Sequence, residues 1–256
     1  MKTVYRILIL VIILAPARLL SQSGQPRFRV LTLSEDGGHH IAYSAAARNW
    51  LDQLAEDSNF KIDHLHSTKD INASLLGNYQ LFIQLDYPPY GWNADAAAAL
   101  EDYINKGLGG WIGFHHASLL GEFEGFALWP WFYNFMGSVR FKDYIPTFAN
   151  AKVVLEQRDH PLFRNLPDSF IIEKEEWYTY DQNPRKNVQV LAHVDEGSYQ
   201  PDSKVKMGDH PVIWSNPDYP ARNVYIFMGH SPALFNDPHY VTLFRNAIFW
   251  AAQNNK

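Results

Sequence analysis

Short apolar segments alternate with amphipathic ones through the first half of the chain. The apolar runs predict buried strands at Phe28–Leu33, Phe60–Leu65, Leu81–Leu85 and Gly110–Phe114. Between them, apolar residues recur at helical spacing from Ile41 onward, and again in a segment that Asn93 caps and Gly107 ends. Strand–helix alternation at this spacing predicts an α/β fold with a parallel, doubly wound sheet.

The carboxyl ends of these strands indicate where a ligand would bind. In open parallel sheets, ligands lie outside the carboxyl ends of the strands. Here those ends lead into three loops, Ser34–His40, Asp86–Trp92 and His115–Gly125. Because these loops carry histidines, an aspartate and aromatic rings, we expect the functional site among them.

The second half of the chain is less regular. The polar stretch Gly197–Gly208 predicts an exposed excursion, and the pattern over His239–Ala252 predicts a closing helix. Further strands are expected at Val153–Gln157, Phe170–Glu173, Val188–His193, Pro211–Trp214 and Val224–Phe227. We find no repeat and no low-complexity tract, so residues 24–256 are expected to form a single domain.

The N-terminus has the pattern of a targeting segment. Lys2 and Arg6 precede the unbroken apolar run Ile7–Ala15, and Ser21 and Ser23 supply the small residues that a signal peptidase requires. We therefore expect residues 1–23 to be a signal peptide, cleaved before Gly24, and the mature protein to be periplasmic or secreted, without stable membrane insertion. The alternative is an uncleaved anchor, for which the run is short.

Composition excludes several classes of protein. The chain has 22 basic and 27 acidic residues, a net charge of −5, so a general basic surface for nucleic acid or anionic lipid is excluded. It has no cysteine, which excludes disulfides, thiolate metal sites, iron–sulfur clusters and a cysteine nucleophile. Aromatic residues make up 15% of the chain, a richness that suits either core packing or a ring-stacking cleft for sugars.

Four segments, in order, carry a family resemblance. Gly109–Ala117 (GGWIGFHHA) resembles the glycine-rich strand and turn of the ThuA-like (trehalose utilisation) family, and His160–Pro167 resembles its "HP…GLP" segment. Glu175–Tyr178 resembles its acidic-acidic-x-Tyr motif, with Glu175 where Asp is usual. The ending "HPV.W…GRV.Y…GH" is matched by His210–Trp214, Ala221–Tyr225 and Gly229–His230. Leu108 and Ala221 stand where the family has glycine.

The resemblance implies a flavodoxin-like fold, a mostly parallel sheet with helices on both faces, similar to class I glutamine amidotransferases. In those enzymes the turn after this strand carries a nucleophilic cysteine, a position that His115 holds here. Because the chain has no cysteine, glutamine hydrolysis by the thiol route is excluded. A serine hydrolase is excluded too, because Ser118 does not lie in a G-x-S-x-G elbow.

Several polar residues are expected to converge at the site: His39 or His40, Asp86, His115, Glu176 and His230. We assign His115, Glu176 and His230 as catalytic, and His39, His40 and Asp86 as substrate-binding. His115, Glu176 and His230 could also bind a divalent metal such as zinc, or act without metal as general acid and base. Their ordinary alternatives are backbone-bonded or solvated histidines, a turn-capping aspartate and an exposed pair at Glu175 and Glu176.

Aromatic rings provide the expected substrate platform. Because adjacent strand residues point to opposite faces, only one of Glu175 and Glu176 should reach the cleft, and the family motif favours Glu176. Trp92, Trp177 and Tyr178 lie in loops or beside this motif and are assigned to substrate binding, since sugar C–H groups pack on rings. His160 and His210 are expected to be structural, and His193 to be a strand-end histidine without a role.

Three functions remain open. The first is an exported enzyme, of hydrolase or isomerase/lyase type, acting on a small saccharide or keto-sugar, as the resemblance implies. The second is a non-catalytic carbohydrate-binding module on an amidotransferase-like scaffold. The third is a glutaminase-like scaffold protein held by a partner, which would expose a large apolar patch.

Overall fold

The computed structural model describes residues 25–35, 39–123 and 125–253. The expected signal peptide, residues 1–23, and its cleavage point before Gly24 lie outside these ranges. Among the helices of the described part, none is both long and apolar enough to cross a membrane.

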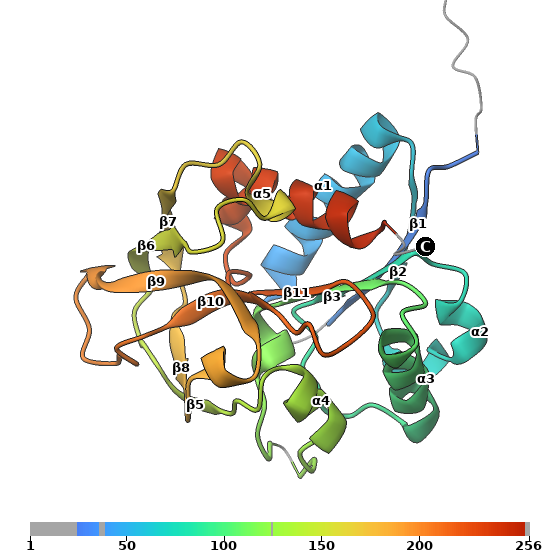
Figure 1. The fold of residues 1–256 in the computed structure, drawn as a ribbon, viewed down its shortest axis with the longest axis horizontal. Helices are drawn as coiled ribbons and strands as arrows, with labels where there is room; N and C mark the ends of the chain where they lie inside the picture. The colour runs from blue at the N-terminus through green and yellow to red at the C-terminus, as the bar shows by residue number, and fades with distance from the viewer. Residues whose placement is uncertain (1–24, 36–38, 124, 254–256) are drawn as a thin grey trace, which may run out of the picture.

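The first half of the chain, joined by one strand from near the C-terminus, forms the parallel part of a nine-stranded sheet (Figure 1). Its strands lie in the order β2-β1-β3-β4-β11 and are all parallel. This is the flavodoxin strand order, so the predicted fold is confirmed. The bounds are β1 Arg29–Ser34, β2 Lys61–Leu65, β3 Leu81–Leu85, β4 Gly110–Phe114 and β11 Asn223–Ile226.

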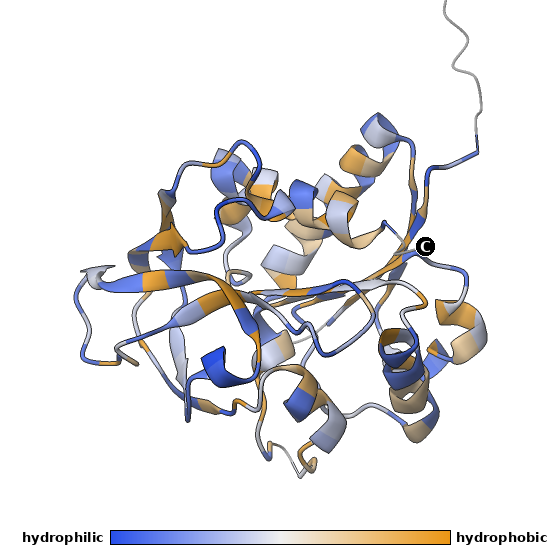
Figure 2. Ribbon diagram, in the orientation of Figure 1, coloured by the Kyte–Doolittle hydropathy of each residue, from blue (hydrophilic) through white to orange (hydrophobic). Residues whose placement is uncertain are grey.

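Helices cover both faces of this sheet. Helices α1 (Ile41–Ser58) and α5 (Pro238–Ala251) lie on one face, and α2 (Ala73–Leu76), α3 (Ala94–Asn105) and α4 (Pro130–Phe135) lie on the other (Figure 1). The central strands are mostly apolar, with polar residues such as Thr32 and Gln84 among them, whereas the helices combine apolar and polar positions (Figure 2). The predicted cap of α3 is confirmed, since the Asn93 side chain accepts a hydrogen bond from the Ala96 amide at 2.8 Å.

The glycine at the start of β4 allows α5 to approach the sheet. A Cβ on Gly110 would lie 2.1 Å from the Ala251 carbonyl oxygen, so no side chain fits there. The end of α5 therefore packs directly on the strand that leads into His115. Short 3₁₀ turns complete the chain at Thr68–Asp70, His115–Ser118, Pro161–Phe163, Pro184–Lys186 and Pro232–Asn236.

An antiparallel wing extends the sheet beyond β11, in the order β10-β9-β6-β7. Its bounds are β6 Ala149–Leu155, β7 Ser169–Glu175, β9 Gln189–Gln200 and β10 Pro211–Ser215. A separate pair, β5 (Phe141–Tyr144) and β8 (Tyr178–Tyr180), was not predicted. The wing matters for function because it places the end of β7, which carries Glu175 and is followed by Glu176, at the edge of the parallel sheet.

The predicted excursion at Gly197–Gly208 needs correction. Strand β9 continues to Gln200, and the exposed turn begins only after it. The turn is anchored from inside: the buried Glu196 carboxylate accepts hydrogen bonds from the amides of Met207 and Gly208 and lies 3.0 Å from His210 Nδ1. His210 is therefore structural, as expected.

Candidate functional site

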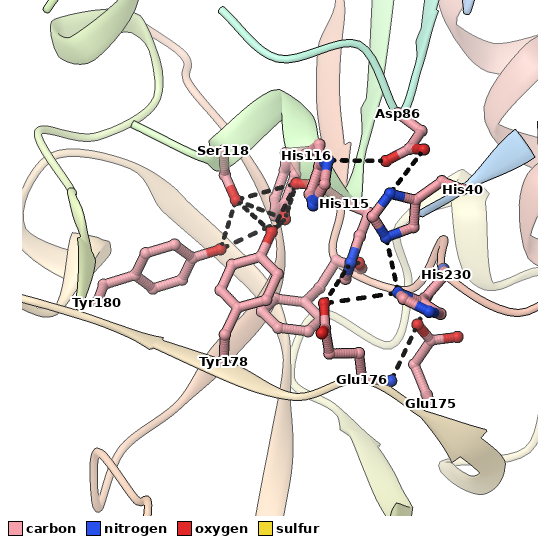
Figure 3. A network of polar contacts seen from close by, with 12 residues as sticks. His40, Asp86, His115, His116, Ser118, Glu175, Glu176, Tyr178, Tyr180 and His230 are labelled. Carbon is pink, nitrogen blue, oxygen red and sulfur yellow. Dashed lines mark hydrogen bonds and ion pairs between the residues drawn. The ribbon is translucent and has the colours of Figure 1, made fainter. Parts of the chain in front are cut away.

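Polar side chains from five segments meet at the carboxyl edge of the parallel strands (Figure 3). The polar cluster consists of His40, Asp86, His115, His116, Glu175, Glu176 and His230. These residues follow β1, β3, β4, β7 and β11, except Glu175, which ends β7. The ligand-binding edge indicated by the sequence is the edge at which they meet.

His115 has an unusual backbone conformation. Its φ of 41° lies in the left-handed region, which is rare for a residue with a side chain, and Asp86 has a φ of 54°. The His115 carbonyl oxygen accepts hydrogen bonds from Tyr178 Oη at 2.6 Å and Tyr225 Oη at 2.9 Å. Ser118 Oγ donates to the same oxygen at 3.2 Å. These bonds hold the strained turn in place.

The imidazole of His115 is equally constrained. Its Nδ1 donates to the Phe227 carbonyl at 3.0 Å, and its Nε2 lies 3.1 Å from Glu176 Oε2. The same carboxylate oxygen lies 3.5 Å from His230 Nδ1. A Cβ on Gly229 would lie 2.9 Å from the His115 Cβ, so only glycine lets the β11 segment pass this close.

His40, His116 and Asp86 form the inner side of the cluster. His40 is 2% exposed; its Nδ1 lies 3.2 Å from Asp86 Oδ2 and its Nε2 lies 2.6 Å from His230 Nδ1. His116 Nδ1 lies 3.5 Å from Asp86 Oδ1, and the ring centroids of His40 and His116 are 3.9 Å apart. One buried carboxylate thus faces two imidazoles.

Burial shifts the pKa values of these groups toward their uncharged forms. It lowers the pKa of His40 and of His116, with the neighbouring histidines adding to the effect, and it raises the pKa of Asp86 and of Glu175. Glu176 differs. Burial would raise its pKa, but hydrogen bonds from His115 and His230 outweigh burial and hold the pKa below its usual value.

Four members of the cluster form the floor of a cleft of about 460 Å³: His40, His116, Glu176 and His230. Its wall is aromatic: Phe141 and Tyr178 line it, together with Tyr144 and Phe148, which are 46% and 47% exposed. His39 also lines the cleft and is exposed, so it lies at the mouth. The described residues also line two larger hollows, of 630 and 740 Å³, but the polar cluster contributes to neither.

The structure brings together most of the residues expected to converge. His115, Glu176 and His230 lie in contact, Asp86 is part of the cluster, and His40 rather than His39 is the buried member.

Two members of the cluster were missed. His116 directly follows His115, and the doublet itself was the available signal. Glu175 was expected to point away from the cleft, and its role behind the cluster was not foreseen: its Oε1 accepts a hydrogen bond from the His230 amide at 2.9 Å. Of the two glutamates only Glu176 lines the cleft, as expected, and Glu175 supports His230 from the buried side.

Two aromatic assignments do not lead to the cleft. Trp92 packs against Trp129 and donates to the Pro88 carbonyl, and it does not line the cleft. Trp177 is 1% exposed, stacked on Phe227 and bonded to the Ala149 carbonyl. Both tryptophans were assigned to substrate binding only because they lie in a loop or beside the acidic motif in the sequence. In the structure both rings pack against other side chains. Tyr178 does line the cleft, although its hydroxyl is committed to His115.

Comparison with known proteins agrees with the fold and the motifs. Residues 29–251 match the model of the ThuA family, described as trehalose utilisation. The chain is a member of the ThuA family.

Solved structures support this membership. A ThuA-like protein from Bacteroides uniformis is 30% identical, with a TM-score of 0.79 over 93% of this chain and 95% of that one. A ThuA-like protein from Parabacteroides merdae is 18% identical, with a TM-score of 0.64 over 91% and 92%. A GMP synthase protein from Thermoplasma acidophilum, 14% identical with a TM-score of 0.52 over 88% and 94%, shares the fold. No curated protein matches the chain.

Proposed function

We propose that this ThuA protein is an exported enzyme acting on a small saccharide or keto-sugar, with His115, Glu176 and His230 as its catalytic groups. The observation that carries the proposal is a buried cluster of histidines and carboxylates that opens on one side into an aromatic cleft. Clusters of this kind place proton donors and acceptors out of water, next to a bound substrate.

His230 is the proton carrier in this proposal. Its side chain is 13% exposed and lines the cleft, so it can reach a substrate hydroxyl or a carbon next to a carbonyl. Glu176 lies 3.5 Å behind it and stabilises the positive charge that the imidazole gains. His115, fixed by the Phe227 carbonyl, holds Glu176 in position.

The cleft suits a small sugar. Its volume of about 460 Å³ lies in the range of small-molecule sites. Tyr144 and Phe148 expose ring faces on which sugar C–H groups can pack, and Phe148 lies 4.7 Å from the His230 ring. A sugar stacked there would lie next to the His230 ring.

A binding module without activity accounts less well for the cluster. Such a module needs the aromatic wall, but burying several histidines and carboxylates costs free energy that binding alone does not require. The proposal therefore favours catalysis over simple recognition.

The test is a conversion assay. Purified protein is incubated with disaccharides and their keto derivatives, and products are followed by NMR. We expect turnover of at least one keto-sugar or saccharide, and a fall in kcat of roughly 10²–10⁴-fold in His230→Gln. His193→Gln is the matched control, because His193 pairs with Glu156 in the wing and should leave activity unchanged. Saccharide binding without any conversion would overturn the proposal in favour of the binding module.

A further inference from the structure

Acceptor groups on the buried side of the polar cluster determine which ring nitrogen of each histidine points into the cluster. His115 Nδ1 faces the Phe227 carbonyl, which can only accept, so Nδ1 carries a hydrogen and Nε2 is the ring nitrogen directed into the cluster. This Nε2 lies 3.1 Å from Glu176 Oε2, within hydrogen-bond distance. An imidazole nitrogen and a carboxylate oxygen, both of which ligate zinc in proteins, therefore face each other at a distance at which a metal ion could replace the shared hydrogen.

The same orientation occurs on the other side of the cluster. His40 and His116 both turn Nδ1 toward a carboxylate oxygen of Asp86, at 3.2 and 3.5 Å. This leaves Nε2 of each ring on the side away from Asp86. A buried carboxylate behind a histidine is the usual support for a metal-ligating imidazole, because it fixes the ring and makes the other nitrogen a better donor to a metal.

We propose that His40, His115, His116 and Glu176 bind one divalent transition-metal ion, Zn²⁺ by preference. One ligand atom from each of these residues lies within 4.8 Å of the others. The 3.1 Å between His115 Nε2 and Glu176 Oε2 is close to the roughly 3.3 Å edge of a tetrahedron with zinc–nitrogen bonds of about 2.0 Å. Three imidazoles and one carboxylate suit zinc and its neighbours, whereas Mg²⁺ and Ca²⁺ prefer all-oxygen sites.

His230 is excluded from this ligand set, which differs from the set expected from the sequence. Its Nδ1 lies 2.6 Å from His40 Nε2, too short for both atoms to bind one metal, and this contact is a hydrogen bond between the rings. A metal on His40 replaces that bond. His230 then turns to the cleft, free to exchange protons with a substrate.

The inference shares its residues with the proposed function but is tested without a substrate. Protein purified without metal-affinity resin is treated with chelator, and Zn²⁺ binding is followed by calorimetry, with metal content by elemental analysis. We expect one zinc per chain and a higher melting temperature with Zn²⁺. His116→Ala and Glu176→Gln should weaken zinc binding at least tenfold, and Asp86→Asn roughly 10–100-fold.

Two further variants make the assignment specific. His230→Gln should keep its zinc although it loses activity, and His193→Gln should keep both. Folding of each variant is checked by thermal unfolding, and His116, the more exposed of the inner histidines, supplies the ligand variant that should fold. Wild-type protein that is folded but binds no zinc, or zinc that Mg²⁺ displaces, overturns the metal site while leaving the conversion assay to decide the enzyme. Unchanged zinc affinity in His116→Ala refutes this ligand set.

Discussion

The backbone of His115 is held by side-chain hydroxyls rather than by its own preference. A residue other than glycine at a φ of 41° costs on the order of 1–3 kcal/mol, and three donors to one carbonyl oxygen offset that cost. Tyr178, Tyr180 and Tyr225 are fully buried and meet at Ser118, and burial raises the pKa of each well above its usual value. They therefore remain protonated donors at any pH of interest.

Removing one of these hydroxyls tests which of them positions His115 and which only stabilises the fold. Tyr225→Phe and Tyr180→Phe should each lower stability by about 1–2 kcal/mol, because each leaves buried polar partners unsatisfied. Of these two tyrosines only Tyr225 donates to the His115 carbonyl, so only Tyr225→Phe should also lower kcat. Thermal unfolding and the conversion assay measure the two effects. Equal kcat values in the two variants would show that the hydroxyl does not position His115.

The exposed ring of Phe148 should act on binding. Phe148→Ala removes a stacking surface worth about 0.5–1.5 kcal/mol, so KM for the saccharide should rise about two- to tenfold with kcat little changed. Phe126→Ala is the control, since Phe126 is 42% exposed but does not line the cleft. A KM that rises equally in both variants would contradict the assignment.

At the level of single residues, chain order predicted most of the site. His115 and His230 each follow a strand of the parallel sheet, and parallel strands bring their carboxyl ends to one edge. What the sequence could not show is which neighbour points inward: His39 and His40 differ by one position and one is at the mouth, the other buried. That choice depends on the geometry of the turn, which no hydrophobic pattern encodes.

At the level of elements, the parallel half was predictable and the wing only partly. Buried strands such as Leu81–Leu85, in which Gln84 is the one polar residue, are nearly continuous apolar runs, which a sequence displays directly. Strand β5, Phe141–Tyr144, is short and mostly exposed, and its pairing with β8 is set by the distant segment that it meets. Such short antiparallel pairs carry little periodic signal of their own.

Glu196 makes the turn after β9 sensitive to acid. Burial would raise the pKa of Glu196, but hydrogen bonds from His210, Met207 and Gly208 outweigh it and hold the pKa below its usual value. A carboxylate with a lowered folded-state pKa stabilises the protein above about pH 4.3, its unfolded value, and this contribution disappears as the pH falls through the folded-state pKa.

Glu196→Gln should therefore cost about 1.5–3 kcal/mol at pH 7 and progressively less below pH 4. Urea unfolding of the two proteins at pH 7, 5 and 3.5 measures the difference. Lys206→Gln, which removes an exposed pair with Asp202 in the same turn, is the control and should change stability by less than about 1 kcal/mol at each pH. A difference that grows toward low pH would be the opposite of what this carboxylate requires.

For the molecule as a whole, we expect export. Expressed in a Gram-negative host, the chain should appear in the periplasmic fraction with its N-terminus near Gly24, because a basic start, a short apolar run and small residues form a cleavable signal. Mass spectrometry of the fractions measures this. An intact chain that still contains Met1, recovered with membranes, would mean that the segment stays as an anchor.

The contact between His40 and His230 joins residues 190 positions apart in the chain. Closing so long a loop is entropically costly, so native contacts of this kind form after the more local ones. Until β11 and its following turn are seated beside β4, the imidazoles and carboxylates can remain hydrated. The free-energy cost of removing water from these side chains therefore arises only in the final stage of folding. The polar cluster therefore cannot assemble on a nascent chain before His230 has been synthesised. Partly folded forms that precede this step lack the assembled site.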